Sequence, residues 1–104
     1  MNHGTGQPKF LFVPVSGPGG AGEYFRSLAV ARARERRWPG CSITFSVSRD
    51  APYARDTPYP VRLVDRSPTY ETRAVNDTIE RERPDVVIFD SSGRVAQYAR
   101  AREL

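Results

Sequence analysis

The chain has a single cysteine and a single histidine in 104 residues. With Cys41 alone, no internal disulfide can form, which fits a reducing compartment. We interpret Cys41, at the start of an expected strand, as a small packing residue and not as a nucleophile. His3 lies in a polar leader and is expected to be inert. No cluster of His, Asp and Glu has the spacing of metal ligands, so we expect no metal site.

Long apolar runs are also missing. No stretch of about 18 apolar residues occurs, so nothing in the sequence is expected to span a membrane. Residues 1–8 are polar and lack the charged-then-apolar layout of a signal peptide, and we expect a short disordered leader there. These features favour a cytoplasmic protein, with peripheral contact at the inner face of the membrane left open.

The charge balance is basic, with sixteen basic and twelve acidic residues and a net charge of +4. Nearly all of the basic residues are arginines. They alternate with acids, as in Glu80–Arg83, and show no aromatic interleaving. This pattern favours a solvated, salt-bridged surface, and we expect no nucleic acid partner.

Apolar runs separated by turn residues predict four strands and three helices. The strands are expected at Phe10–Val15, Ser42–Val47, Val61–Val64 and Asp85–Phe89, and the helices at Glu23–Arg37, Pro68–Arg83 and Arg94–Leu104. Strands one and four are continuously apolar, which is typical of strands covered on both faces. Strand two alternates, so one of its faces should be less buried. Prolines in the connection Ser48–Pro60 predict a loop without regular structure.

The helices are expected to turn their apolar sides inward. For the first helix these residues are Tyr24, Phe25, Leu28, Ala29, Ala31 and Ala33, opposite several arginines. For the second they are Tyr70, Ala74, Val75, Thr78 and Ile79. Pro84 is expected to end the second helix.

The order βαββαβα predicts an α/β fold with an open, doubly wound parallel sheet of strand order 3-2-1-4 and three helices. Strands one and four are then neighbours, and the connection reverses direction between them. Ligands bind outside the carboxyl ends of strands at such a point. The loops Ser16–Glu23 and Asp90–Arg94 should meet there.

The loop Ser16–Glu23 is rich in glycine, and Gly17, Gly19 and Gly22 have the G-x-G-x-x-G spacing. Glycine permits a tight turn and a close approach of the main chain to a ligand. The following helix directs unpaired N–H groups and a partial positive charge at the same place. The candidate ligand contacts are therefore Ser16, Gly17, Gly19, Gly20 and Gly22 in the first loop and Ser91, Ser92, Gly93 and Arg94 in the second.

A glycine loop of this spacing has a dinucleotide site as its default interpretation, which requires an acid about 20 residues further on. The expected region holds Gly40 and Cys41 instead. Arg49, after strand two, could hold a 2′-phosphate, so an NADP-binding or non-catalytic Rossmann-like module remains an alternative.

The stretch Val13–Ala31 resembles the start of a GT-B glycosyltransferase, in the branch that includes the lipid-II-forming N-acetylglucosaminyltransferase. In that branch a glycine-rich loop after the first strand leads into a helix with Leu-Ala spacing. Arg83–Asp90 is similar to the "(R/K)-P-D-hydrophobic run-Asp" strand of the same half. The likeness covers about residues 9–104.

The resemblance implies an N-terminal, acceptor-side Rossmann-like domain over residues 9–104 that is incomplete at its C-terminus. It implies a sugar or lipid-linked acceptor as substrate and a nucleotide-sugar as co-substrate, with no other cofactor. In that fold the donor is held mainly by a C-terminal domain, which we expect to lie outside these 104 residues. We therefore expect the 104-residue chain alone to be inactive.

One position departs from the family pattern, because many relatives carry histidine where Glu23 stands. Glu23 is a candidate general base on the acceptor, and its alternative role is to cap the helix or orient the acceptor. The change also leaves open the nucleotide-sugar hydrolases of the same fold. Asp90, at the end of strand four, is the second candidate catalytic residue, and its alternative role is to cap the third helix. Arg26 is expected to be an exposed surface residue.

Overall fold

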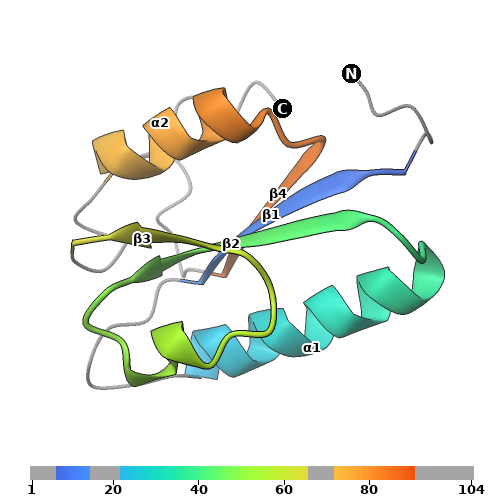
Figure 1. Ribbon diagram of the computed structural model, residues 1–104, viewed down its shortest axis with the longest axis horizontal. Helices are drawn as coiled ribbons and strands as arrows, with labels where there is room; N and C mark the ends of the chain where they lie inside the picture. The colour runs from blue at the N-terminus through green and yellow to red at the C-terminus, as the bar shows by residue number, and fades with distance from the viewer. Residues whose placement is uncertain (1–6, 15–21, 66–71, 91–104) are drawn as a thin grey trace.

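The computed structural model describes residues 7–14, 22–65 and 72–90. These form three layers, with a four-stranded sheet between one helix on each face (Figure 1). The elements are β1 (Lys9–Pro14), α1 (Gly22–Arg37), β2 (Ser42–Ser48), a short 3₁₀ helix η1 (Pro52–Arg55), β3 (Val61–Val64), α2 (Thr72–Glu82) and β4 (Val86–Asp90).

The sheet is parallel throughout and its strand order is β3-β2-β1-β4, which confirms the predicted fold class and order. β1 pairs with both β2 and β4. The described residues contain two α-helices, not three, because the third predicted helix, Arg94–Leu104, lies outside them. None of the helices in the described ranges is long and apolar enough to cross a membrane.

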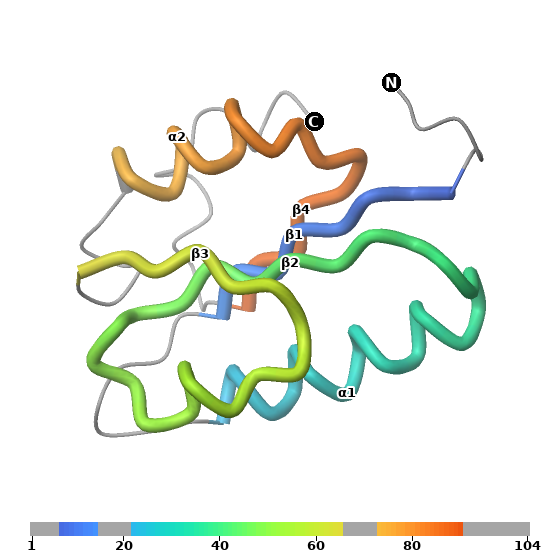
Figure 2. Tube along the Cα trace, viewed as in Figure 1, coloured from blue at the N-terminus to red at the C-terminus, as the bar shows by residue number. Residues whose placement is uncertain are grey.

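The layer between α1 and the sheet is aromatic. Phe12 of β1 stacks on Phe45 of β2 with ring centroids 5.1 Å apart, and both side chains are fully buried. Tyr24 of α1 stacks on Tyr53 of η1 at 3.9 Å. Figure 2 shows how the connection after β2 passes beside the first turns of α1 to make this contact. Large flat rings therefore fix α1 against the sheet.

The layer between α2 and the sheet is aliphatic and carries hydroxyl groups. Leu11, Val13 and Val64 of the sheet pack with Val75 and Ile79 of α2. The polar side of β2 faces this layer and is fully buried at its last three members, Thr44, Ser46 and Ser48. The prediction of a less buried face on strand two is therefore wrong, because α2 covers that face. Within the described part of the chain, the Ser46 Oγ atom has no hydrogen-bond partner.

The predicted apolar side of the first helix is only partly correct. Tyr24, Leu28 and Ala31 are buried, as predicted. Phe25 is 61% exposed, and Ala29 and Ala33 are exposed as well. Successive residues of a helix are rotated by about 100°, so Phe25, Ala29 and Ala33 lie on a different side from the buried set. Ser27 is buried in their place.

Local signals explain where the later elements begin and end. α2 ends at Glu82, and the next residue, Arg83, has a positive φ of 50° that leads the chain into Pro84. Proline cannot continue a helix, so the predicted stop is confirmed. The loop after β2 does contain a regular turn, η1, with Pro52 at its first position, contrary to the sequence prediction. Proline is compatible with that position because its N–H is not needed there.

Candidate functional site

The candidate site lies where β1 and β4 end side by side. Pro14, the last residue of β1, is in register with Asp90, the last residue of β4. Both strands end at the edge of the sheet from which α1 starts, since α1 begins at Gly22 after the loop that follows β1. The predicted adjacency of the first and fourth strands is therefore confirmed.

Arg26 of α1 binds the carboxylate of Asp90 with two hydrogen bonds. Its Nε donates to Oδ2 at 2.7 Å and its Nη2 donates to Oδ1 at 2.6 Å. Such paired contacts between a guanidinium and a carboxylate are directional and stronger than a single neutral hydrogen bond. The hydrogen bond to Asp90 and the charge of that carboxylate raise the pKa of Arg26, with a smaller contribution from Glu23.

The two partners differ in exposure, which bears on their roles. The Asp90 side chain is 18% exposed and the Arg26 side chain 65%. Asp90 points toward α1 because alternate residues of β4 face alternate sides of the sheet, and Ile88 of the same side packs against the α1 cluster. Both of its oxygens are occupied by Arg26. This arrangement suits a carboxylate that positions other groups better than one that accepts a proton.

Glu23 lies in the first turn of α1, three residues before Arg26, and is half-buried. Residues three apart on a helix are neighbours, so Glu23 shares the Arg26 side of α1. The positive end of the helix dipole favours a carboxylate at this position. At the neighbouring Gly22, an added Cβ would meet no atom within 4 Å, so packing within the protein does not require glycine there.

The first turn of α1 is held in place by aromatic contacts. Tyr24 is buried, as expected for a core residue, and the hydroxyl group of Thr57 donates a hydrogen bond to its hydroxyl oxygen at 3.1 Å. Phe25 packs edge-on against Tyr24 with centroids 5.2 Å apart, but most of its ring faces solvent. Glu23 and Arg26 therefore extend from a helix end that the aromatic layer fixes.

Most of the ligand contacts predicted from the glycine and serine loops lie outside the described residues. These are Ser16, Gly17, Gly19, Gly20, Ser91, Ser92, Gly93 and Arg94. Their predicted meeting at the edge of the sheet therefore stays a prediction. Of the predicted set, Gly22, Glu23 and Asp90 are described, and the structure brings all three to the carboxyl edge of β1 and β4.

Sequence reasoning missed the role of Arg26, which was expected to be an ordinary surface arginine. The available signal was the parallel pairing of strands one and four, which places the end of strand four near the first turns of the helix that follows strand one. What the sequence does not contain is the rotation of that helix about its axis. This rotation decides which of its many arginines reaches Asp90.

Arg49 and Asp65 form a second ion pair at the same edge of the sheet. Arg49 directly follows β2 and Asp65 directly follows β3, and Nε of Arg49 lies 3.0 Å from Oδ1 of Asp65. Both side chains are exposed, at 57% and 77%. Arg49 thus occupies the predicted position for contact with a 2′-phosphate, but in this structure it is paired with an acid.

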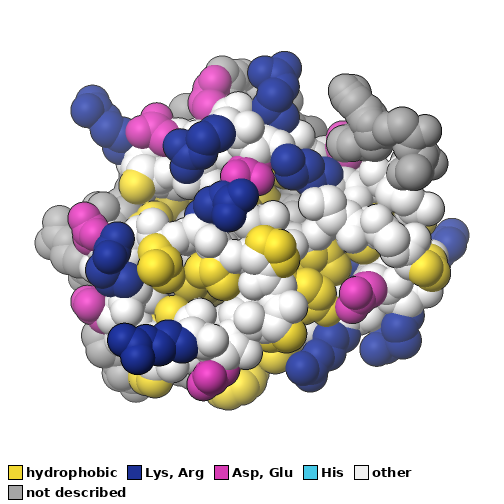
Figure 3. All heavy atoms as spheres, viewed as in Figure 1, with side chains coloured by type: hydrophobic (Ala, Val, Ile, Leu, Met, Phe, Trp, Pro, Cys, Tyr) yellow, Lys and Arg dark blue, Asp and Glu magenta, His cyan; other side chains and the backbone are white. Residues whose placement is uncertain are grey.

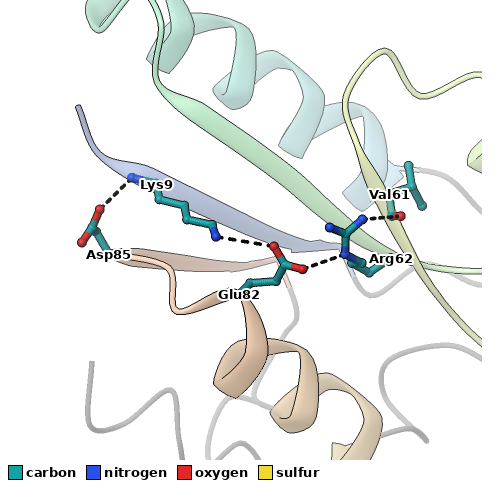
Figure 4. Close-up of polar contacts among 5 residues, drawn as sticks. All are labelled: Lys9, Val61, Arg62, Glu82 and Asp85. Carbon is teal, nitrogen blue, oxygen red and sulfur yellow. Dashed lines mark hydrogen bonds and ion pairs between the residues drawn. The ribbon is translucent and has the colours of Figure 1, made fainter. Parts of the chain in front are cut away.

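A third polar cluster lies away from the carboxyl edge, on the α2 side of the sheet. Glu82, at the end of α2, accepts a hydrogen bond from Nε of Arg62 at 2.7 Å and lies 3.6 Å from Nζ of Lys9 (Figure 4). Asp85 accepts a hydrogen bond from the main-chain N–H of Lys9. Burial by itself raises the pKa of Glu82, but the hydrogen bond and charge of Arg62, with the charge of Lys9, outweigh it and lower that pKa below its ordinary value. This cluster joins β1, β3 and α2.

The single cysteine, Cys41, lies beside the aromatic cluster. Cys41 is half-buried and packs against the aromatic cluster, and burial raises the pKa of its thiol. A thiol in that state is a poor nucleophile, in agreement with a packing role.

Within residues 7–14, 22–65 and 72–90, no three His, Cys, Asp or Glu side chains gather as metal ligands would.

Comparisons with known proteins find no relative. No protein-family model matches the chain, and neither the curated proteins nor the solved structures contain a significant match.

Proposed function

We propose that the chain is the acceptor-binding domain of a glycosyltransferase of the GT-B type, with the acceptor sugar bound at the carboxyl ends of β1 and β4. The observation that carries the proposal is the grouping of Asp90, Arg26 and Glu23 at this edge. The edge lies at the point of the 3-2-1-4 sheet where the winding direction reverses, which is where ligands bind in such sheets. The resemblance of Val13–Ala31 and Arg83–Asp90 to that family supplies the reaction.

In the proposed reaction an acceptor hydroxyl attacks the anomeric carbon of a nucleotide-sugar and loses its proton. The bond from that carbon to the phosphate oxygen breaks at the same time, and the nucleotide leaves with its phosphate groups. Glu23 is the residue that takes this proton, because it stands at the helix end that faces the edge. Asp90, held by Arg26, accepts hydrogen bonds from other hydroxyl groups of the acceptor and orients it. The donor is bound by a second domain, in the same or another polypeptide.

Binding of sugars to the chain tests the first half of this proposal. Amide chemical shifts in ¹⁵N-labelled protein are followed during titration with N-acetylglucosamine and, separately, with its 1-phosphate. We expect the largest shifts at Glu23, Arg26 and Asp90, and small ones at Lys9 and Glu82. Shifts confined to other parts of the sheet would contradict the proposed location.

Gly22→Ala is a sharp companion variant. The added methyl group meets no atom of the described residues within 4 Å and slightly favours the helix, so the fold should keep or gain stability. A sugar that approaches the main chain at residue 22 would nevertheless clash with the added methyl group. Weaker sugar binding with an unchanged or higher melting temperature supports the site, whereas equal binding argues against close approach at this residue.

The NADP-binding alternative makes a different prediction at Arg49. Fluorescence titration with NADPH should then show binding that Arg49→Ala weakens about tenfold or more, since a guanidinium–phosphate contact would be lost. We expect no such binding. NADPH binding that depends on Arg49 would favour the module without transferase activity.

The hydrolase alternative has its own test. Release of nucleotide from UDP-N-acetylglucosamine by the chain alone would favour it.

A further inference from the structure

The outer side of α1 carries exposed arginines. Arg32 and Arg36 are exposed, and in the part of the chain that the structure describes neither forms an ion pair. Figure 3 shows basic side chains at the lower right of the molecule, over the C-terminal half of α1, with an acidic side chain beside them. The sequence predicted basic residues that form salt bridges with nearby acids. Lys9, Arg49 and Arg62 follow this prediction, whereas Arg32 and Arg36 form no ion pair within the described residues.

The two acids of α1 are Glu23 and Glu35. Glu35 accepts a hydrogen bond from the hydroxyl group of Tyr59 at 2.9 Å, so it faces the connection between β2 and β3. Glu23 lies at the opposite end of the helix, on the Arg26 side. Glu35 is also the neighbour of Arg32 on the helix, three residues further on, and the charge of Arg32 acts on the same Tyr59 hydroxyl. Glu35 therefore offsets part of the charge of Arg32, and Arg36 lies one turn further along the exposed side.

An exposed aromatic ring lies on the same stripe. Phe25, Ala29, Arg32 and Arg36 follow each other at intervals of four, three and four residues, which places them on one side of the helix. With a rise of about 1.5 Å per residue, Phe25 lies roughly 16 Å from Arg36 along the axis. Phe25 is 61% exposed and is supported from below by the buried ring of Tyr24.

We propose that this outer face of α1 binds single-stranded nucleic acid. Arginine side chains separated by one helical turn suit consecutive phosphates, which they can bind with two hydrogen bonds each. An exposed ring on a rigid support provides a surface on which an unpaired base stacks. A duplex keeps its bases stacked on one another and makes no use of Phe25. A bilayer requires a larger apolar area than one phenylalanine with two alanines.

The test is fluorescence anisotropy of the full chain with labelled dT₂₀ and rU₂₀ at 50 and 200 mM salt. We expect binding that weakens about sevenfold between these salt concentrations, with a slope of log K against log salt of about −1.4 if Arg32 and Arg36 neutralise two phosphates. The double variant Arg32→Glu/Arg36→Glu should bind at least tenfold more weakly and have a flatter slope. Phe25→Ala should weaken binding about fivefold or more while leaving the slope unchanged, because stacking is not ionic.

The matched control is Arg73→Glu/Arg81→Glu, which makes the same change of charge at two exposed arginines of α2. It should lower the affinity by no more than about threefold, through the change in net charge. Circular dichroism of every variant checks that the fold is kept. The proposal is overturned if both double variants lose affinity equally, if neither oligonucleotide binds at 50 mM salt, or if the chain sediments with phosphatidylglycerol vesicles while leaving the oligonucleotides unbound.

Discussion

Two of the charged clusters within the described residues are built in different ways. On the α2 side, Glu82 is 11% exposed and is shared by Lys9 and Arg62, so that one carboxylate joins three elements. At the carboxyl edge, Asp90 is held by a single arginine that is 65% exposed. A buried carboxylate with two cations is costly to disturb, whereas an exposed guanidinium can exchange its partner at little cost. The first cluster therefore serves the fold, and the second is suited to a ligand.

The largest effect that this comparison predicts is on catalysis. Glu23→Gln should lower turnover by about 10²–10⁴-fold in a protein that also contains the donor-binding domain, because the amide cannot take up a proton. The melting temperature should fall only slightly, because Glu23 is not part of the Glu82 cluster and the loss of its charge at the start of α1 costs roughly 0.3–1 kcal/mol. Asp77→Asn, an exposed acid-to-amide change on α2, is the control. Near-normal turnover in Glu23→Gln would assign this residue to helix capping.

The second effect is on stability, at the other cluster. Glu82→Gln should lower the free energy of unfolding by about 1–2 kcal/mol, because Arg62 and Lys9 would lose their shared carboxylate in a poorly solvated place. Urea denaturation measures the change, again with Asp77→Asn as control. Equal stability of the two variants would mean that the cluster contributes no more than an exposed pair.

The pH dependence of stability follows from the same carboxylate. The pKa of Glu82 is lower in the folded chain than in the unfolded chain. Its contribution is therefore complete above the unfolded value, about 4.3, and is lost as the pH falls through the folded value. The stability difference between the native chain and Glu82→Gln should be constant from pH 7 to about pH 5 and shrink below that. A difference that persists at pH 2 would contradict an electrostatic origin.

The smallest effect on stability is expected at the carboxyl edge itself. Arg26→Met keeps the length of the side chain but removes both hydrogen bonds to Asp90. Because Arg26 is largely solvent-exposed, the melting temperature should stay the same within error. Sugar binding, measured by the amide shifts of Asp90, should nevertheless weaken. A marked loss of stability would show that both clusters are structural and would remove the contrast between them.

The sequence predicted the architecture well because the relevant signals are local or periodic. Continuous apolar runs identified β1 and β4, and proline identified the end of α2. The glycine spacing and the strand order pointed to the same edge of the sheet. Gly22, Glu23 and Asp90 are found there.

The errors concern which side of an element faces which neighbour. Phe25 is apolar but exposed, and Ser46 is polar but buried, since both depend on how the helices lie on the sheet. Hydrophobicity alone assigns such residues to the wrong side. The pairing of Arg26 with Asp90 joins residues 64 positions apart in the chain and depends on the same rotation of α1. No pattern along the sequence contains that angle.

The hydroxyl-bearing side of β2 has a consequence for engineering. Ser46 Oγ is enclosed and has no hydrogen-bond partner among the described residues, and it lies on the opposite side of the sheet from Glu23 and Arg26. Replacement by alanine removes that oxygen without adding volume. The variant Ser46→Ala, in the layer between α2 and the sheet, is therefore expected to raise the melting temperature.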